Sequence, residues 1–145
     1  MNAIAPKKFQ LERFLPLIPM RVFVDFTGKN FSALLDYDRL NGMCEKIQRH
    51  KAQAIIKQVR NQLETMLEYS HRIAEQQKLE IIEEAKHQMH KNLGDELNRL
   101  QALQTINPSI REEEITFFKE LIRANENYIN QASLKLQALR VIVTK

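Results

Sequence analysis

The sequence predicts an α+β fold that is predominantly α-helical, in which a long antiparallel helical hairpin is joined to a small β-sheet. Apolar residues recur at helical spacing over residues 82–103 and again over residues 115–143. The sequence Asn107-Pro108-Ser109 separates these two stretches. The whole chain of 145 residues holds three Gly and four Pro, too few for many short strands joined by tight turns.

The N-terminal part predicts a linker followed by a β-hairpin. Prolines interrupt residues 1–19, which we expect to be an extended lead-in. Residues 20–145 would then form a single elongated helical domain. Within it, residues 20–36 are expected to form the hairpin, because residues 21–25 alternate strand-forming side chains and residues 27–30 favour a turn.

The next element is a helix, or two helices, over residues 38–104. Asp36 or Asp38 is suited to cap its first amides. No proline occurs in this range, but the apolar stripe of residues 55–66 loses its register before a new stripe begins at Ile82. The sequence leaves open a continuous helix or two helices with a bend, and any bend or change of face is expected near residues 68–80.

The return helix is expected over residues 109–138. Its start fits a capping box between Ser109 and Glu112, with Asn107 as the rival cap. Its stripe steps by three and four residues: Ile115, Phe118, Ile122, Asn125, Ile129, Ala132, Leu136, Leu139 and Val143. The β-branched residues 139–144 favour a C-terminal strand that pairs with residues 21–25 and completes the small sheet.

The composition is that of an ordinary single domain, with 43% hydrophobic and 28% charged residues. Cys44 is the one cysteine, so an intramolecular disulfide is impossible and a reducing compartment is expected. No signal-peptide pattern and no apolar run of about 20 residues occurs. These features favour a cytoplasmic location.

Three residue pairs that contain histidine are considered as metal ligands. Glu68 with His71, and Glu84 with His87, each form a Glu-x-x-His pair, as in di-iron helical bundles. On one helix these pairs would lie roughly 24 Å apart, too far to share a metal centre. His87 and His90 form only a partial site. We therefore expect a solvated helix surface with no metal, no cofactor and no catalytic residue.

A local excess of positive charge is the best candidate for a binding function. Residues 39–60 contain a single acidic residue and six basic ones, which we call the basic segment: Arg39, Lys46, Arg49, Lys51, Lys57 and Arg60. A solvated surface is the simplest interpretation. The alternative is contact with phosphates or with an acidic protein partner. No aromatic residue lies among these cations, so recognition of single-stranded bases by stacking is not expected.

Several motifs in order resemble the C-terminal part of the RapA family, the bacterial RNA polymerase-associated ATPases of Swi/Snf type. They are Arg13-Phe14-Leu15-Pro16, residues 19–25 with Gly28-Lys29-Asn30, residues 97–103, residues 106–111 and residues 131–143. The most specific blocks are residues 100–111 and 136–143. Ser133-Leu134 replaces the Gly-Trp that often follows Gln-Ala in the family.

This resemblance implies a C-terminal accessory or interaction module of a protein that promotes polymerase recycling. Its implied partners are the RNA polymerase core and other domains of the parent protein, in the bacterial cytoplasm and near the nucleoid. The sequence lacks a phosphate-binding loop and an acidic metal box, so ATP and magnesium are expected only in the parent ATPase domain. Two alternatives remain: a nonspecific nucleic-acid-binding helical module, and a self-associating coiled coil that forms homodimers.

Overall fold

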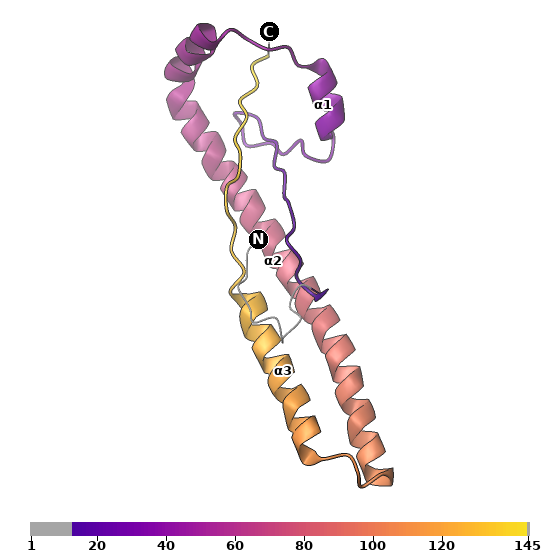
Figure 1. Ribbon diagram of the computed structural model, residues 1–145. Helices are drawn as coiled ribbons and strands as arrows, with labels where there is room; N and C mark the ends of the chain where they lie inside the picture. Colours follow the sequence, from indigo (N-terminus) through magenta and orange to yellow (C-terminus); the bar gives the residue numbers. More distant parts are fainter. Residues whose placement is uncertain (1–12, 145) are drawn as a thin grey trace. The chain divides into compact units, whose positions relative to one another are not determined.

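The computed structural model describes residues 13–144, and the regular structure in this range is helical (Figure 1). The helices are α1 (Tyr37–Met43), α2 (Arg49–Ile106) and α3 (Glu112–Asn130). The described residues divide into two compact units. Unit 1 contains residues 13–19 and 78–135, and unit 2 contains residues 20–77 and 136–144. α2 therefore contributes residues to both units.

The predicted α+β class with a small β-sheet is wrong, because no strand or sheet forms among residues 13–144. Where the hairpin was expected, Val24 and Asn30 form an isolated antiparallel bridge. The Phe31 amide donates to the Phe23 carbonyl at 2.7 Å, but the Phe23 amide donates to the Ser32 hydroxyl at 2.8 Å. The Ser32 hydroxyl thus replaces a backbone carbonyl as the acceptor for the Phe23 amide, and the antiparallel hydrogen-bond pattern does not continue.

The predicted C-terminal strand is also absent. Residues 134–144 carry no regular secondary structure, and Figure 1 shows them as an irregular segment. Within unit 2 a side chain links this segment to α1, since Arg140 Nη1 donates to Asn41 Oδ1 at 2.8 Å. A β-branched sequence favours an extended backbone, but a strand also requires a neighbouring strand that offers free backbone groups.

Unit 1 confirms the predicted helical hairpin. Residues 78–106 of α2 and all of α3 lie side by side and antiparallel, joined by residues 107–111 (Figure 1). The buried apolar residues of the core come from both helices, from residues 13–19 and from the residues just after α3: Phe14, Leu15, Ile82, Ala85, Met89, Leu93, Ile129 and Ala132. Met89 and Ile129 are completely buried. The two apolar stripes therefore meet over this part of their length.

Residues 13–19 belong to this core, although the prolines predicted only a lead-in. Phe14 and Leu15 are buried in the same cluster as Met89 and Ile129. Proline prevents a regular helix here, but it does not prevent the neighbouring side chains from packing. The segment is irregular in backbone and still covers apolar surface of the hairpin.

α3 is shorter than predicted at both ends. The expected capping box is wrong: Arg111 is the N-cap and makes no side-chain cap hydrogen bond. Asn107 Oδ1 instead accepts from the amide and hydroxyl of Ser109 and shapes the loop. Three Glu residues do occupy the first turn, where the helix dipole favours negative charge. The helix ends at Asn130, and Leu136, which the stripe predicted as buried, is 65% exposed.

The region predicted as one long helix or two helices is interrupted closer to its N-terminus than residues 68–80. α1 is capped by Asp36, whose carboxylate accepts from the Arg39 amide at 2.7 Å, as one of the two predicted caps. A break follows between Met43 and Arg49. Within α2 the backbone leaves helical geometry at Val59, with φ −109° and ψ 15°. Residues 68–80, where any bend was expected, are helical throughout, and the departure from helical geometry lies at Val59 instead.

A tight turn organises the N-terminal part of unit 2. The Asp25 carboxylate accepts from the Thr27 hydroxyl at 2.6 Å and from the amides of Thr27 and Lys29, both at 2.9 Å. The bond from the Thr27 hydroxyl is the largest of the effects that lower the Asp25 pKa. Because this pKa is lowered on folding, the carboxylate stabilises the turn above the ordinary aspartate pKa. That stabilisation is lost as the pH falls through the lowered value.

Gly28 allows this turn to pack against α2. Its φ of +87° lies in the left-handed region, and a Cβ atom there would lie 3.0–3.2 Å from ring carbons of Tyr69. We expect Gly28→Ala to lower the free energy of unfolding of unit 2 by about 1–2 kcal/mol, because strain and crowding combine. Amide hydrogen exchange of residues 20–36 measures this effect.

Gly42 provides the matched control for this substitution. It lies in α1, and no atom lies within 4 Å of the Cβ that alanine would add. Gly42→Ala should therefore stabilise α1 by about 0.5–1 kcal/mol, the difference in helix propensity. Equal protection factors in both variants would contradict the role given to Gly28.

Candidate interaction surfaces

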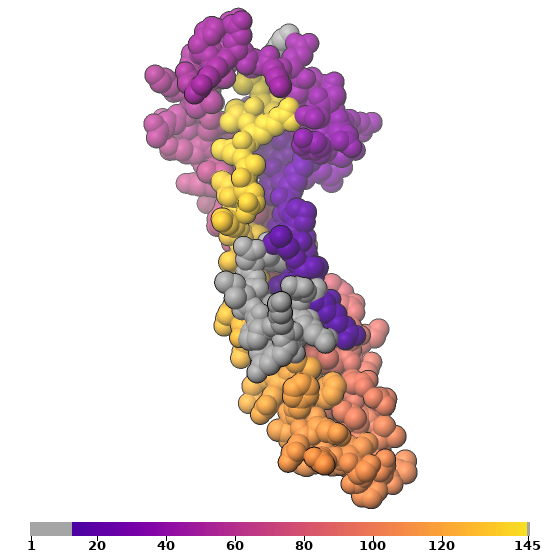
Figure 2. Space-filling model, in the orientation of Figure 1, coloured from indigo at the N-terminus to yellow at the C-terminus, as the bar shows by residue number. Residues whose placement is uncertain are grey.

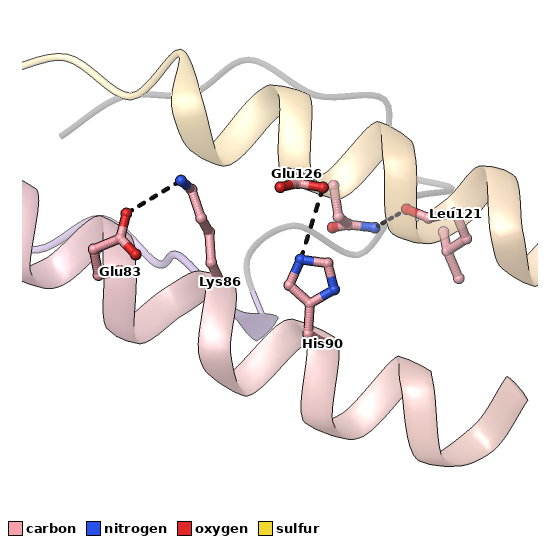
Figure 3. Close-up of polar contacts among 6 residues, drawn as sticks. Glu83, Lys86, His90, Leu121 and Glu126 are labelled. Atoms are coloured by element: carbon pink, nitrogen blue, oxygen red, sulfur yellow. Dashed lines mark hydrogen bonds and ion pairs between the residues drawn. The ribbon is translucent and has the colours of Figure 1, made fainter. Parts of the chain in front are cut away.

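The polar contacts of the helical hairpin serve its packing. His90 of α2 points toward Glu126 of α3, with 3.7 Å between Nε2 and Oε2 (Figure 3). Lys86 pairs with Glu83 at 3.2 Å on α2 itself. Asn125 is completely buried and donates from Nδ2 to the Leu121 carbonyl at 2.9 Å. Of these three contacts, the pair of His90 and Glu126 joins the two helices, and the other two lie within one helix each.

The histidine pairs considered as metal ligands are dispersed along α2. His71 faces Glu75 at 3.9 Å and not a second histidine. Glu84 accepts a hydrogen bond from Gln88 at 2.9 Å, and His90 turns to Glu126. Within residues 13–144 no group of three or more His, Cys, Asp or Glu side chains is arranged to hold a metal ion. Cys44 is a half-buried free thiol.

The basic segment is fully displayed to solvent. Arg39 lies in α1, Lys46 in the connection after it, and the other four cations in the first turns of α2. All six side chains are exposed, and the atoms of this purple stretch lie at the surface in Figure 2. An ion pair joins Arg60 to Glu64 at 3.4 Å, between side chains that are mostly exposed. Such a pair is weak and leaves the cations accessible to a partner.

Sequence reasoning missed an exposed aromatic side chain on the turn of unit 2. Phe26 is 71% exposed, although it directly follows Asp25 and its hydrogen-bonded turn. Aromatic side chains on rigid elements are frequent anchors of protein interfaces. The combination of Asp25, Thr27 and Gly28 is the signal in the sequence that could have located this turn.

A groove lies between the helices of unit 1 near their connecting loop. It has a volume of about 480 Å³ and is lined by Glu96, Arg99, Leu100, Glu113, Glu114, Phe117 and Phe118. Arg99 donates a hydrogen bond to Glu96. This hydrogen bond is the largest of the effects that lower the Glu96 pKa. Phe117 packs edge-on against Phe118 with ring centroids 5.9 Å apart and remains exposed. The sequence stripe contained Phe118 but not Phe117.

Comparison with known proteins identifies the family. A family model described as RNA polymerase recycling family C-terminal, RapA_C, matches residues 1–144. The chain belongs to the RapA C-terminal family. The RNA polymerase-associated protein RapA of Vibrio campbellii is 35% identical over 143 residues, and that of Yersinia enterocolitica is 34% identical over 143 residues. Each alignment covers 99% of this chain and 15% of the relative.

Membership in the RapA C-terminal family confirms the resemblance found in the sequence motifs. The match includes the core segment around Phe14, the hairpin of α2 and α3, and the basic segment. The chain spans about 15% of the length of these relatives, so their name describes much more than the region that is aligned here. None of the helices in the described part is long and apolar enough to cross a membrane.

Proposed function

We propose that this chain is a non-catalytic interaction module of a RapA-type, RNA polymerase-associated ATPase. The observation that supports the proposal is the match over residues 1–144 to the RapA C-terminal family, whose curated relatives are named RNA polymerase-associated proteins. The module binds the polymerase core or positions other domains of the parent protein, in the cytoplasm of the bacterium. Polymerase recycling and ATP hydrolysis, with its magnesium, belong to the complete parent protein.

The packing of the two units is consistent with an interaction role. Unit 1 is a well-packed hairpin whose apolar stripes are buried against each other, so its core does not require a second copy of the chain. In unit 2, by contrast, the only apolar side chains that are buried among residues 20–77 and 136–144 are Val24 and Leu40. Its exposed large apolar residues include Phe26, Leu34, Met43, Ile47, Ile56, Leu136 and Leu139. Apolar surface of this kind is typical of protein contacts.

Capture of purified RNA polymerase core by the immobilised chain tests the proposal. Nuclease treatment removes nucleic acid, and two salt concentrations separate electrostatic from apolar contributions to affinity. We expect saturable capture at low salt that an excess of free chain competes away. No capture at either salt concentration would assign the chain to internal positioning of the parent ATPase instead.

Direct nonspecific nucleic-acid binding is the second candidate, favoured by the exposure of all six cations of the basic segment. Contacts to phosphates release counterions, so affinity for a DNA duplex would fall steeply with salt concentration. Affinity for duplex that exceeds the affinity for nuclease-treated polymerase would favour this second function.

A further inference from the structure

The start of α2 carries positive charge where a helix favours negative charge. Arg49 and Lys51 stand at its beginning, and its first turn contains no acidic residue. The unpaired amides of a helix N-terminus form the positive end of the helix dipole, so cations there oppose helix formation. α3 shows the opposite arrangement, with three Glu in its first turn. Helix stability therefore does not account for the cations of α2.

Four exposed side chains lie on these turns. Arg49, Ile56 and Lys57 follow the spacing i, i+7 and i+8, which places them on a common side of the helix. Arg60 directly follows Val59, where the backbone leaves helical geometry. All four are exposed, and Ile56 is 43% exposed although it is apolar. The half-buried residues of the same turns are offset to a neighbouring side: Ala52, Ile55 and Val59. We call the first four residues the docking face.

We propose that the docking face binds an acidic protein surface that also offers an apolar contact to Ile56. Three cations around one exposed isoleucine match a partner with carboxylates around an apolar patch. Met43 and Ile47, also exposed, extend the apolar character toward α1. The inference rests on the proposed function, because it specifies the chemistry of the surface through which this module would contact polymerase.

A protein surface fits these residues better than a nucleic acid does. Phosphates match the three cations but give no gain from burying Ile56. Single-strand binding sites use aromatic side chains for base stacking, and residues 39–60 contain no aromatic residue. Carboxylates on a protein surface satisfy both the charge and the apolar component of the docking face.

The test compares two triple variants of the chain in the polymerase capture assay. The first is Arg49→Glu, Lys57→Glu and Arg60→Glu. The matched control, Lys91→Glu, Lys119→Glu and Arg123→Glu, reverses three exposed cations of unit 1 and changes the net charge equally. We expect the first variant to lose affinity at low salt by about tenfold or more, and the control to change by less than about twofold. Equal losses of affinity in the two variants would overturn the proposal, because they would show that the net charge of the chain and not the docking face determines binding.

A single substitution separates binding from folding. Arg49→Glu should raise the melting temperature by about 1–3 °C, because a carboxylate suits the helix start, while it weakens polymerase capture. Ile56→Ser should weaken capture at both salt concentrations, since its contribution is apolar. If Arg49→Glu lowered stability and capture together, the cation would have a structural role, and the proposal would be rejected.

The remaining outcomes distinguish the inference from the proposed function. Capture by the wild-type chain with an unaffected first triple variant would overturn the docking face alone. No capture by the wild-type chain would overturn the docking face together with the polymerase-binding role, and would leave internal positioning of the parent ATPase as the function. Loss of duplex binding with unchanged capture of nuclease-treated polymerase would reassign the docking face to nucleic acid.

Discussion

Ile129→Ala is expected to lower the free energy of unfolding of the chain by about 2–5 kcal/mol. Ile129 lies near the end of α3, is completely buried, and packs in one cluster with Met89 of α2 and with Phe14. Truncation removes apolar contacts and leaves a cavity that surrounding side chains fill only in part. Urea denaturation followed by far-ultraviolet circular dichroism measures the change.

Leu136→Ala provides the control, because the sequence stripe placed both residues on one buried helix face. Leu136 is 65% exposed and lies beyond the end of α3. Its truncation should change the free energy of unfolding by no more than about 0.5 kcal/mol. A loss as large as that of Ile129→Ala would mean that α3 continues past Asn130, as the periodicity predicted.

The hairpin of unit 1 could be predicted because the residue patterns that specify it lie within each helix and in the short connection between them. Each apolar stripe needs only one helix period to be recognised, and the Asn107-Pro108 break shows that two helices follow each other. Two adjacent helices with matching stripes and a short connection pack antiparallel. Met89 and Ile129 are the residues where this prediction is most directly confirmed.

The small sheet could not be predicted reliably because a strand depends on its neighbour. Residues 21–25 and 139–144 have strand-forming side chains, but propensity does not show whether free backbone groups lie opposite. In the structure the Ser32 hydroxyl occupies the acceptor position beside Phe23. Arg140 reaches α1 through its side chain and not through its backbone.

The residues of the candidate surfaces could be predicted only in part from the sequence. The basic segment is visible as a count of charges, and its exposure follows because isolated cations are rarely buried. The exposure of Phe26 could not be predicted, because an aromatic residue after Asp25 is equally consistent with a core position. Helix capping at Ser109 failed for a similar reason: Asn107 competes for the same hydroxyl and amide.

A buried polar residue interrupts the apolar seam of unit 1. Asn125 occupies a stripe position between Ile122 and Ile129 and is completely buried. Its Nδ2 group donates to the Leu121 carbonyl, but its Oδ1 atom has no hydrogen-bond partner among the described residues. A buried acceptor without a partner lowers stability. In helical seams such a residue also favours one register and one association state over others.

Asn125→Leu should therefore raise the free energy of unfolding by about 1–3 kcal/mol, because it removes the unpaired acceptor and extends the apolar stripe. Asn125→Ala removes the same acceptor without adding volume. It therefore separates the effect of removing the unpaired acceptor from the effect of overpacking by leucine. Urea denaturation gives the stability of each variant. A loss of stability in both would show that Oδ1 is hydrogen-bonded in solution. If the asparagine also enforces a single association state, sedimentation should detect oligomers of Asn125→Leu at concentrations where the wild-type chain is monomeric.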